Sequence, residues 1–296
     1  MTEPVVLHEP LPTLDSPVFV GMLTGWIDAS NAGAAAIEAV STACDARVLA
    51  TFDADLFIDY RARRPTMELR DGVNERLVWP AIQLSVGRDP AGRDVLLLSG
   101  PEPDSAWHRF TDLVTGMAAD LGTQLAVFLG AYPFASPHTR PARLSCSSPS
   151  AELCARVAFL KNSVDVPAGV NAALEHGFHS KGIDAIGLWA QVPHYLGTMS
   201  YPAATVALVD GLAELSGLSL DVQALRNEAT LQRTRVDQLV AGNEEHQVMV
   251  RQLEALYDAA AEQDDGGTAI DPDMIPSGDE LAAEVERYLR DQDDTR

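Results

Sequence analysis

Four short apolar runs in the first 216 residues are each followed, after a turn, by a helical pattern. The runs are rich in Val, Leu and Ile and carry almost no charge, which is typical of strands that are buried on both faces. Repeated alternation of strand and helix is typical of an α/β protein with helices on both faces of its sheet. The sequence therefore predicts a mainly parallel sheet, with strands and following helices at residues 17–24 and 29–44, 94–99 and 104–121, 124–129 and from about 150, and 183–190 and 203–215.

The segment between the first helix and Asp94 has a different pattern. It alternates apolar and polar residues and contains turn signals at Asp71-Gly72 and at residues 90–92. This pattern is typical of antiparallel strands joined by tight turns. We therefore expect an antiparallel extension of the sheet in this segment.

The C-terminal quarter of the chain differs from the rest in charge. Residues 217–296 contain 19 acidic and 7 basic side chains, about half of the net charge of −22 that the whole chain carries. Such a shift in composition marks a separate unit. The sequence predicts an α/β core domain at residues 1–216 and an acidic helical region at residues 217–296.

Within this acidic region two helical arrangements are open. Apolar or small residues can be placed at heptad positions from Val222 to Ala260, which allows one long coiled coil. However, Gly242 is a helix-ending residue, and Asn243 followed by two glutamates is a helix-starting signal. We favour two antiparallel helices at about 220–240 and 244–262. A capping box at residues 277–280 predicts a last short helix up to residue 290.

Charge and composition exclude several classes of partner. A net charge of −22 repels nucleic acids and anionic membranes. The longest apolar runs are far shorter than the roughly 20 residues that cross a bilayer, so we expect a cytoplasmic protein. The three cysteines have irregular spacing, which predicts free thiols, no disulfide framework and no structural zinc site. We expect no metal and no cofactor.

Three loops follow predicted strands and carry polar side chains. In an open α/β sheet the ligand site lies beyond the carboxyl ends of the strands. In such a site the histidines could serve as acid and base, an aspartate could orient one of them, and the arginine could bind an anion. The alternative is that these are structural turns whose side chains bind the backbone. The candidate ligand-binding residues are Trp26, Asp28, His138, Thr139, Arg140, His194 and Tyr195.

The chain has no complete catalytic motif. The sequence contains no G-x-S-x-G nucleophile elbow, no phosphate-binding G-x-x-x-x-G-K-[ST] loop, no G-x-G-x-x-G and no HExxH. Cys146 has no activating partner nearby in the sequence, so a buried, unreactive thiol is the better interpretation. We therefore assign no catalytic residue and favour a non-enzymatic protein over an enzyme.

Six stretches together resemble the proteasome assembly chaperone 2 family, in its actinobacterial branch. They are GWIDASNAG, DADLFIDYRARRP, SGPEPDSAW, LGAYPFASPHTRP, LWAQVPHY and IPSGDELAAEVERYLR, and they span about residues 15–290. The resemblance implies a core similar to purine nucleoside phosphorylases and related hydrolases. It also implies homo- or hetero-oligomers that bind proteasome subunits and assist their assembly, and it assigns no catalytic residue.

The resemblance has one departure. Proteasome-binding relatives often end in a hydrophobic residue, a tyrosine and one further residue, whereas this sequence ends in Asp-Gln-Asp-Asp-Thr-Arg. Tyr288 lies within a predicted helix, so we do not expect docking by that route. The leading hypothesis is a homo-oligomeric, assembly-chaperone-like interaction protein whose acidic helices bind a protein partner. The alternative is a small-molecule-binding protein or enzyme with a phosphorylase-like pocket at the strand ends.

Overall fold

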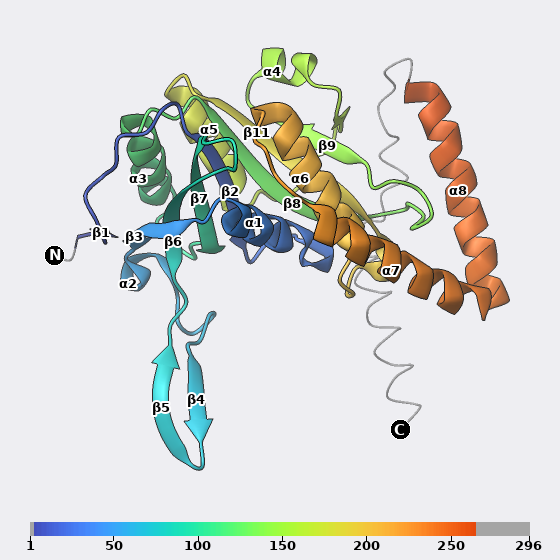
Figure 1. Ribbon diagram of the computed structural model, residues 1–296, viewed down its shortest axis with the longest axis horizontal. Coiled ribbons are helices and arrows are strands. Elements are labelled where there is room, and N and C mark those ends of the chain that lie inside the picture. The colour runs from blue at the N-terminus through green and yellow to red at the C-terminus, as the bar shows by residue number, and fades with distance from the viewer. Residues whose placement is uncertain (1–2, 265–296) are drawn as a thin grey trace.

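The computed structural model describes residues 3–264 and is built around one nine-stranded sheet (Figure 1). Its strands are β1 (Val5–Leu7), β2 (Val18–Thr24), β3 (Arg47–Phe52), β6 (Ile82–Arg88), β7 (Asp94–Pro101), β8 (Leu125–Phe134), β9 (Leu144–Ser147), β10 (Leu160–Lys161) and β11 (Asp184–Pro193). They lie in the order β1-β3-β6-β7-β2-β8-β11-β9-β10. This arrangement confirms the predicted α/β class.

The centre of the sheet is parallel. Strands β7, β2, β8 and β11 are neighbours and all run in the same direction. The β8–β11 pair is the longest, since it extends from Leu125 opposite Asp184 to Phe134 opposite Pro193. The carboxyl ends of these strands therefore meet at one edge of the sheet.

Antiparallel strands extend this centre on both sides, so the sheet is mixed. Strands β1, β3 and β6 form antiparallel pairs next to β7. The sequence predicted antiparallel strands between the first helix and Asp94, which is where β3 and β6 lie. Strand β9 pairs antiparallel with β11, and β10 is parallel to β9. The intervening strands β4 (Thr66–Arg70) and β5 (Val73–Val78) form a separate hairpin that projects from the body (Figure 1).

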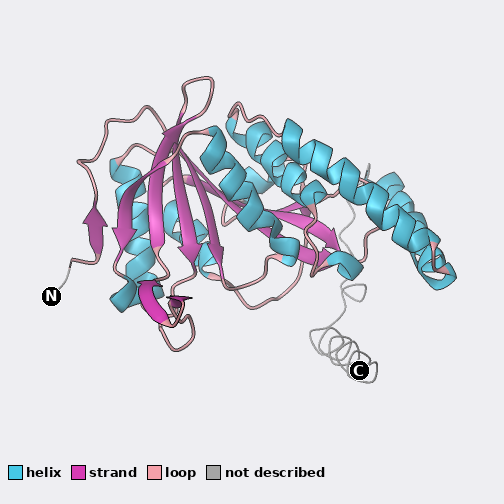
Figure 2. Ribbon diagram, turned by 60° about the horizontal axis from the view of Figure 1, so that its bottom comes forward, coloured by secondary structure: helices cyan, strands magenta, loops and turns pink. Residues whose placement is uncertain are grey.

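Helices cover both faces of the sheet (Figure 2). The helices are α1 (Ala32–Ala43), α2 (Ala54–Phe57), α3 (Trp107–Asp120), α4 (Ala151–Arg156), α5 (Val170–Ser180), α6 (Pro202–Ser216), α7 (Gln223–Ala241) and α8 (Glu244–Asp264), with 3-10 turns at Ala29–Asn31 and His194–Leu196. Helix α1 starts three residues later than predicted because Ser30 and Asn31 have positive φ angles of 59° and 54°, outside the helical region.

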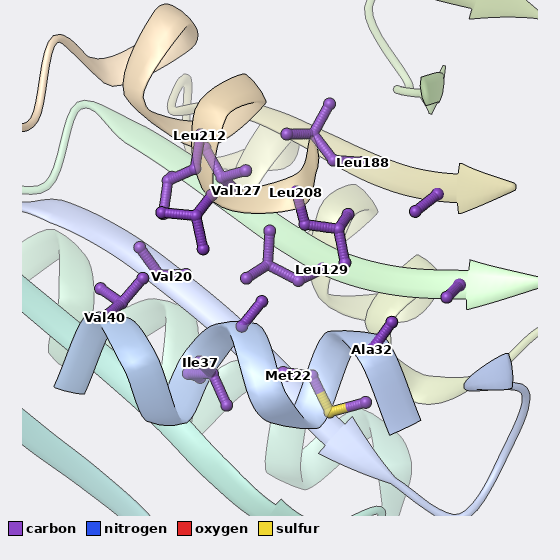
Figure 3. Packing of buried hydrophobic residues seen from close by; sticks show 14 of the residues in the cluster. Val20, Met22, Ala32, Ile37, Val40, Val127, Leu129, Leu188, Leu208 and Leu212 are labelled. Carbon is purple, nitrogen blue, oxygen red and sulfur yellow. The ribbon is translucent and has the colours of Figure 1, made fainter. Parts of the chain in front are cut away.

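The first core lies between the sheet and helices α1 and α6. Alternate strand residues such as Val20 on β2, Val127 on β8 and Leu188 on β11 point to this side, as expected for the two-residue period of a strand. They pack against Ile37 of α1 and Leu208 of α6 (Figure 3). This core fixes the loops that connect β2 to α1 and β11 to α6.

The second core lies on the opposite face, under α3 and α5. The intervening strand residues, including Phe19 and Phe128, point to this side. Their rings lie 4.8 Å and 6.0 Å from the ring of Phe178 on α5. Helix α5 was not among the predicted helices, although it positions the cavity described below.

The C-terminal region contains two helices within the described residues. Helix α7 ends at Ala241 and α8 begins at Glu244, so the predicted break at Gly242 is confirmed and a single coiled coil is wrong. The side chain of Asn243 accepts hydrogen bonds from the backbone N–H of Glu245 (2.9 Å) and His246 (3.3 Å), which caps α8.

The boundary at 216/217 stays a prediction, and Val236 of α7 is buried in the first core. The predicted helix at 277–290 lies outside the described residues. Between residues 3 and 264, no helix is long and apolar enough to span a membrane.

Candidate functional site

The three predicted loops meet at the carboxyl edge of the parallel strands. The loop after β2 contacts the loop after β11, because Ser30 donates hydrogen bonds to the backbone oxygens of Leu196 (Oγ, 3.0 Å) and Gly197 (N, 2.9 Å). The loop after β8 contacts the same segment, because the backbone N–H of His138 donates to the hydroxyl of Tyr195 at 2.8 Å. The sequence therefore located one real cluster of loops.

His138 joins this cluster to helix α7. Its side chain is only 1% exposed. Nδ1 lies 2.6 Å from the hydroxyl of Tyr195, and Nε2 lies 3.0 Å from Oδ1 of Asp237 on α7. Burial raises the pKa of Tyr195 to about 12, so this hydroxyl stays neutral at physiological pH. Both ring nitrogens are thus used within the chain.

The next two residues bind helix α8. Thr139 donates to Oε1 of Glu254 at 2.5 Å. Arg140 makes a two-point contact with Asp258, with Nε 2.8 Å from Oδ1 and Nη2 2.7 Å from Oδ2, and Nη1 lies 3.2 Å from Glu254. The hydrogen bonds raise the pKa of Arg140 and lower that of Asp258, since each charge favours the other. We call residues 134–143 the anchor loop.

Two further contacts extend this interface. The hydroxyl of Tyr257 on α8 donates to the backbone oxygen of Pro141 at 3.0 Å. The guanidinium of Arg143 lies 4.2 Å from the centre of the Tyr257 ring, and it also donates to the backbone oxygen of Tyr257 at 3.3 Å. The anchor loop therefore holds both α7 and α8 against the α/β body through four of its side chains and the backbone oxygen of Pro141.

Asp28 and His194 also make contacts within the chain. The carboxylate of Asp28 accepts hydrogen bonds from the backbone N–H of Gly33 (2.8 Å) and Ala34 (3.0 Å) at the start of α1. Burial raises the pKa of Asp28, and these two bonds oppose that rise. The ring of His194 lies perpendicular to that of Tyr195 at 5.4 Å. That these residues bind a ligand stays a prediction.

A cavity of about 640 Å³ lies at the same edge, on the α5 side of the sheet. Its walls come from β2, β8, β9, β11 and the first turns of α5, and residues 162–169 form one side. Trp26 is the predicted site residue that lines it, and the indole packs over Gly169 just before α5. Most of the lining is apolar, as is typical of small-molecule sites.

Two glycines in the sheet create room for this cavity. A Cβ on Gly130 of β8 would lie 2.5 Å from the ring of Trp189. A Cβ on Gly187 of β11 would lie 2.5 Å from Oγ of Ser147 and 2.6 Å from Oε1 of Glu175. Both distances are too short for any real Cβ contact. The absent side chains let an indole and a carboxyl group lie close to the sheet.

Glu175 of α5 belongs to a small polar group at the cavity wall. The residue is 4% exposed, and Ser147 Oγ lies 3.3 Å from each of its carboxyl oxygens. The indole N–H of Trp189 donates to the same hydroxyl at 3.2 Å. Burial raises the pKa of Glu175 to about 8, against the lowering effect of Ser147. The carboxyl group is therefore mostly protonated at neutral pH.

Glu102 and Cys146 are two further titratable groups that line the cavity. Glu102 accepts a hydrogen bond from the backbone N–H of Val170 at 2.8 Å, so its carboxylate lies at the N-terminus of α5. Burial raises its pKa, opposed by this bond and by Arg63. Burial also raises the pKa of Cys146 to about 11, which agrees with an unreactive thiol.

Sequence reasoning missed this second group of residues. Glu175 lies within a helix that was not predicted, and Ser147 lies on a short strand next to β11. A signal was nevertheless present, since Gly130 precedes Tyr132 and Gly187 precedes Trp189 by two residues. A glycine and an aromatic residue on the same face of a strand indicate a hollow beside a large ring. Within residues 3–264, no three His, Cys, Asp or Glu side chains are grouped to hold a metal ion.

Comparison with known proteins gives one family. The sequence matches the family model of the PAC2 family over residues 22–240. A Mycobacterium tuberculosis protein of unknown function is 33% identical, with 90% of this chain and 92% of that chain covered and a TM-score of 0.81. No protein of curated function matches the sequence.

Two further solved structures are similar over most of the chain. A PAC2 family protein from Streptomyces avermitilis is 32% identical, and a proteasome-assembly chaperone homologue from Mycobacterium tuberculosis is 29% identical. Each alignment covers 79% of this chain and 99% of the other, with TM-scores of 0.72 and 0.73 respectively. The likeness therefore covers nearly the whole of these relatives.

Proposed function

Because this chain belongs to the PAC2 family, we propose that it is a non-enzymatic, chaperone-like protein that binds other proteins through its C-terminal helices. The first partners to test are proteasome subunits, since a relative of this chain is described as a proteasome-assembly chaperone homologue. The observation that carries the proposal is the anchor loop, because it uses its polar side chains to hold α7 and α8 in place.

The two helices present large apolar side chains to solvent. Leu231 and Leu239 on α7 are 61% and 66% exposed, and Val248 and Leu256 on α8 are also exposed. In each helix the two residues are eight positions apart, a spacing that places them on one broad side. Where exposed apolar side chains form one patch with polar residues around it, that patch is typical of a protein-binding surface. We therefore propose α7 and α8 as the partner-binding surface.

Charge supports a partner with a basic surface. Residues 217–264, which include α7 and α8, contain 9 acidic and 4 basic side chains. An excess of acidic side chains speeds association with a positively charged partner and disfavours nucleic acids. We place this activity in the cytoplasm.

We further propose that the protein self-associates through its α/β body. The β4–β5 hairpin supports this proposal, because an isolated two-stranded hairpin is marginally stable in water. Met67, Leu69, Val73 and Leu77 of this hairpin are all exposed. A second copy that covers these side chains would stabilise the hairpin, and light scattering after gel filtration measures whether an oligomer forms.

The interaction is tested with purified proteasome α and β subunits from the organism that encodes this chain. We expect the wild-type protein to co-elute with the subunits and to change the rate at which they assemble. The double variant Leu231→Asp/Leu239→Asp should abolish both effects. Leu11→Asp is the matched control, since Leu11 is also exposed but lies before β2. Equal binding by the double variant would exclude α7 as the surface.

A further inference from the structure

The cavity beside Trp189 has an unusual balance of side chains. Three acidic residues line it, namely Glu102, Asp165 and Glu175. No Lys, Arg or His is among the described residues that line it. Three aromatic rings also contribute to its wall, those of Trp26, Tyr132 and Trp189.

From this lining we infer that the cavity binds a small organic cation, a substituted ammonium with an apolar body. The faces of aromatic rings attract ammonium groups, and Trp gives the strongest attraction. The cavity supplies two Trp rings and one Tyr ring around an otherwise apolar space. A volume of about 640 Å³ is within the range of sites for small molecules. An apolar body would replace water along Met22, Leu23 and Val166.

Glu175 is the group that a bound ammonium would neutralise. The carboxyl group is buried, and Ser147 is the side chain that bonds it. An ionised carboxylate in such a place has a high free energy unless a positive charge lies nearby. A ligand cation would supply that charge, so binding and ionisation of Glu175 would favour each other.

Anionic ligands fit the cavity poorly. A helix N-terminus is the usual site for a phosphate or carboxylate, but at α5 the N–H of Val170 already binds Glu102. The basic groups beside Glu102 and Cys146 are also engaged, since Arg63 pairs with Asp104 at 3.1 Å and Lys161 donates to the backbone oxygen of Val157 at 2.6 Å. A phosphate in the cavity would therefore lie among three acidic side chains, and no Lys, Arg or His of the described residues lines the cavity to bind it.

The pH dependence of binding follows from this arrangement. A permanent cation should bind more tightly as the pH rises toward about 8, because Glu175 then ionises more easily. The other titratable groups around Glu175 are Cys146 on β9 and, in the wall of the same cavity, Glu102 and Asp165, while Lys161 on β10 lies near Cys146. Cys146 stays protonated in this range because its pKa is about 11. Binding should release a proton at neutral pH.

The test is a titration followed by tryptophan fluorescence, since Trp26 and Trp189 line the cavity. The probes are choline and its neutral analogue 3,3-dimethylbutan-1-ol, together with benzyltrimethylammonium and phenylacetate. We expect each cation to bind about tenfold more tightly than the neutral or anionic probe. Absence of cation binding at millimolar concentration, or tighter binding of phenylacetate, would overturn the inference.

The variant Glu175→Gln identifies the responsible group. It keeps the shape of the side chain and one acceptor oxygen for Ser147 but removes the charge, so we expect about a tenfold loss of affinity for the cations and no change for the neutral probe. Glu152→Gln on α4 is the control, because this side chain is exposed and outside the cavity. Wild-type cation affinity in Glu175→Gln would overturn the assignment.

A second measurement avoids any effect of the substitution on folding. The affinity of the wild-type protein for benzyltrimethylammonium is measured between pH 6 and pH 8. We expect an increase of about tenfold over this range, because the probe keeps its charge while Glu175 ionises. A flat profile would contradict a role for Glu175 in cation binding.

Discussion

The anchor loop and the cavity lie at the same edge of the sheet, on neighbouring elements. Their polar groups differ in how many partners they have within the chain. In the anchor loop, His138 and Arg140 find partners on α7 and α8. In the cavity, the buried Glu175 is bonded by the hydroxyl of Ser147 and faces a largely apolar space. The loop is rich in groups that could bind a ligand, whereas the cavity has the room for one.

The difference shows that the type of a polar side chain does not decide whether it is free to bind a ligand. A histidine, a threonine and an arginine after a strand suggest a binding site, but their donors are used when another part of the chain supplies acceptors. A glutamate in a helix suggests an exposed charge. A glycine on the strand that the helix covers, here Gly187, can leave room for the carboxyl group to be buried.

The largest effect should come from Glu175→Gln at alkaline pH. The pKa of Glu175 is about 8 in the folded protein and close to 4.5 in the unfolded chain. The unfolded chain therefore loses this proton first, so the free energy of unfolding falls as the pH rises from about 4.5 to 8. Glu175→Gln should remove this fall, which is worth on the order of 5 kcal/mol above pH 8.

Urea unfolding across this pH range measures the effect, with Glu152→Gln as the control. The control curve should follow the wild type at every pH. If the Glu175→Gln curve also stays parallel to the wild type, the carboxyl group is not held neutral by burial.

The next effect should come from His138→Ala. The substitution removes a buried ring that contacts both Tyr195 and Asp237. The lost hydrogen bonds and the space left behind should lower the free energy of unfolding by about 3 kcal/mol. His194→Ala is a matched control, since that ring also lies edge-on to Tyr195. Equal losses in the two variants would show that His138 has no special role.

Gly130→Ala should have a somewhat smaller effect. The new methyl group would lie 2.5 Å from the ring of Trp189, so the indole must move. Such overpacking costs about 1–3 kcal/mol, and the fluorescence of Trp189 should change with it. The control is Gly116→Ala on α3, where a Cβ meets no atom within 4 Å. A normal spectrum and wild-type stability in Gly130→Ala would show that this glycine is not needed for the cavity.

The smallest effect should come from Arg140→Ala, because this side chain is partly exposed and water screens its ion pairs. We expect a drop in melting temperature smaller than that of His138→Ala. Arg140 lowers the pKa of Asp258 below its ordinary value of 3.8. The stabilisation is therefore complete above that value and is lost as the pH falls below it.

Thermal melts at neutral and strongly acidic pH check this prediction. The difference between wild type and Arg140→Ala should vanish in acid. Arg226→Ala is the control, since Arg226 pairs with Asp210 outside the anchor loop. A difference that persists unchanged in acid would mean that Asp258 is not the partner that matters.

Much of the fold could be predicted because its signals are local. The buried strands β2, β7, β8 and β11 appear as apolar runs, and Gly242 with Asn243 indicates the break between the last two described helices. Helix α5 has a weaker pattern, since Glu175, Gly177 and two histidines interrupt its apolar residues. The sequence predicted that the β4–β5 segment extends the main sheet, but it forms a separate hairpin. Alternating apolar and polar residues indicate a strand without showing which strand it pairs with.

The candidate site was predictable only in part. The rule that loops gather at the carboxyl ends of parallel strands correctly brought together the loops after β2, β8 and β11. Their contacts with Asp237 and Glu254 could not be read from the sequence, because these residues are about 100 positions away in the chain. Whether a polar group is free to bind a ligand depends on such distant partners. A single sequence does not show which distant residues are in contact.

The anchor loop holds α8 on the α/β body through its contacts with Glu254, Tyr257 and Asp258. Hydrogen exchange of residues 244–261 tests this role in the double variant His138→Ala/Arg140→Ala, with His194→Ala/Arg226→Ala as the control. We predict fast exchange in α8 of the test variant while α1 and α6 stay protected, and near wild-type exchange in the control. Unchanged protection of α8 in the test variant would contradict the claim.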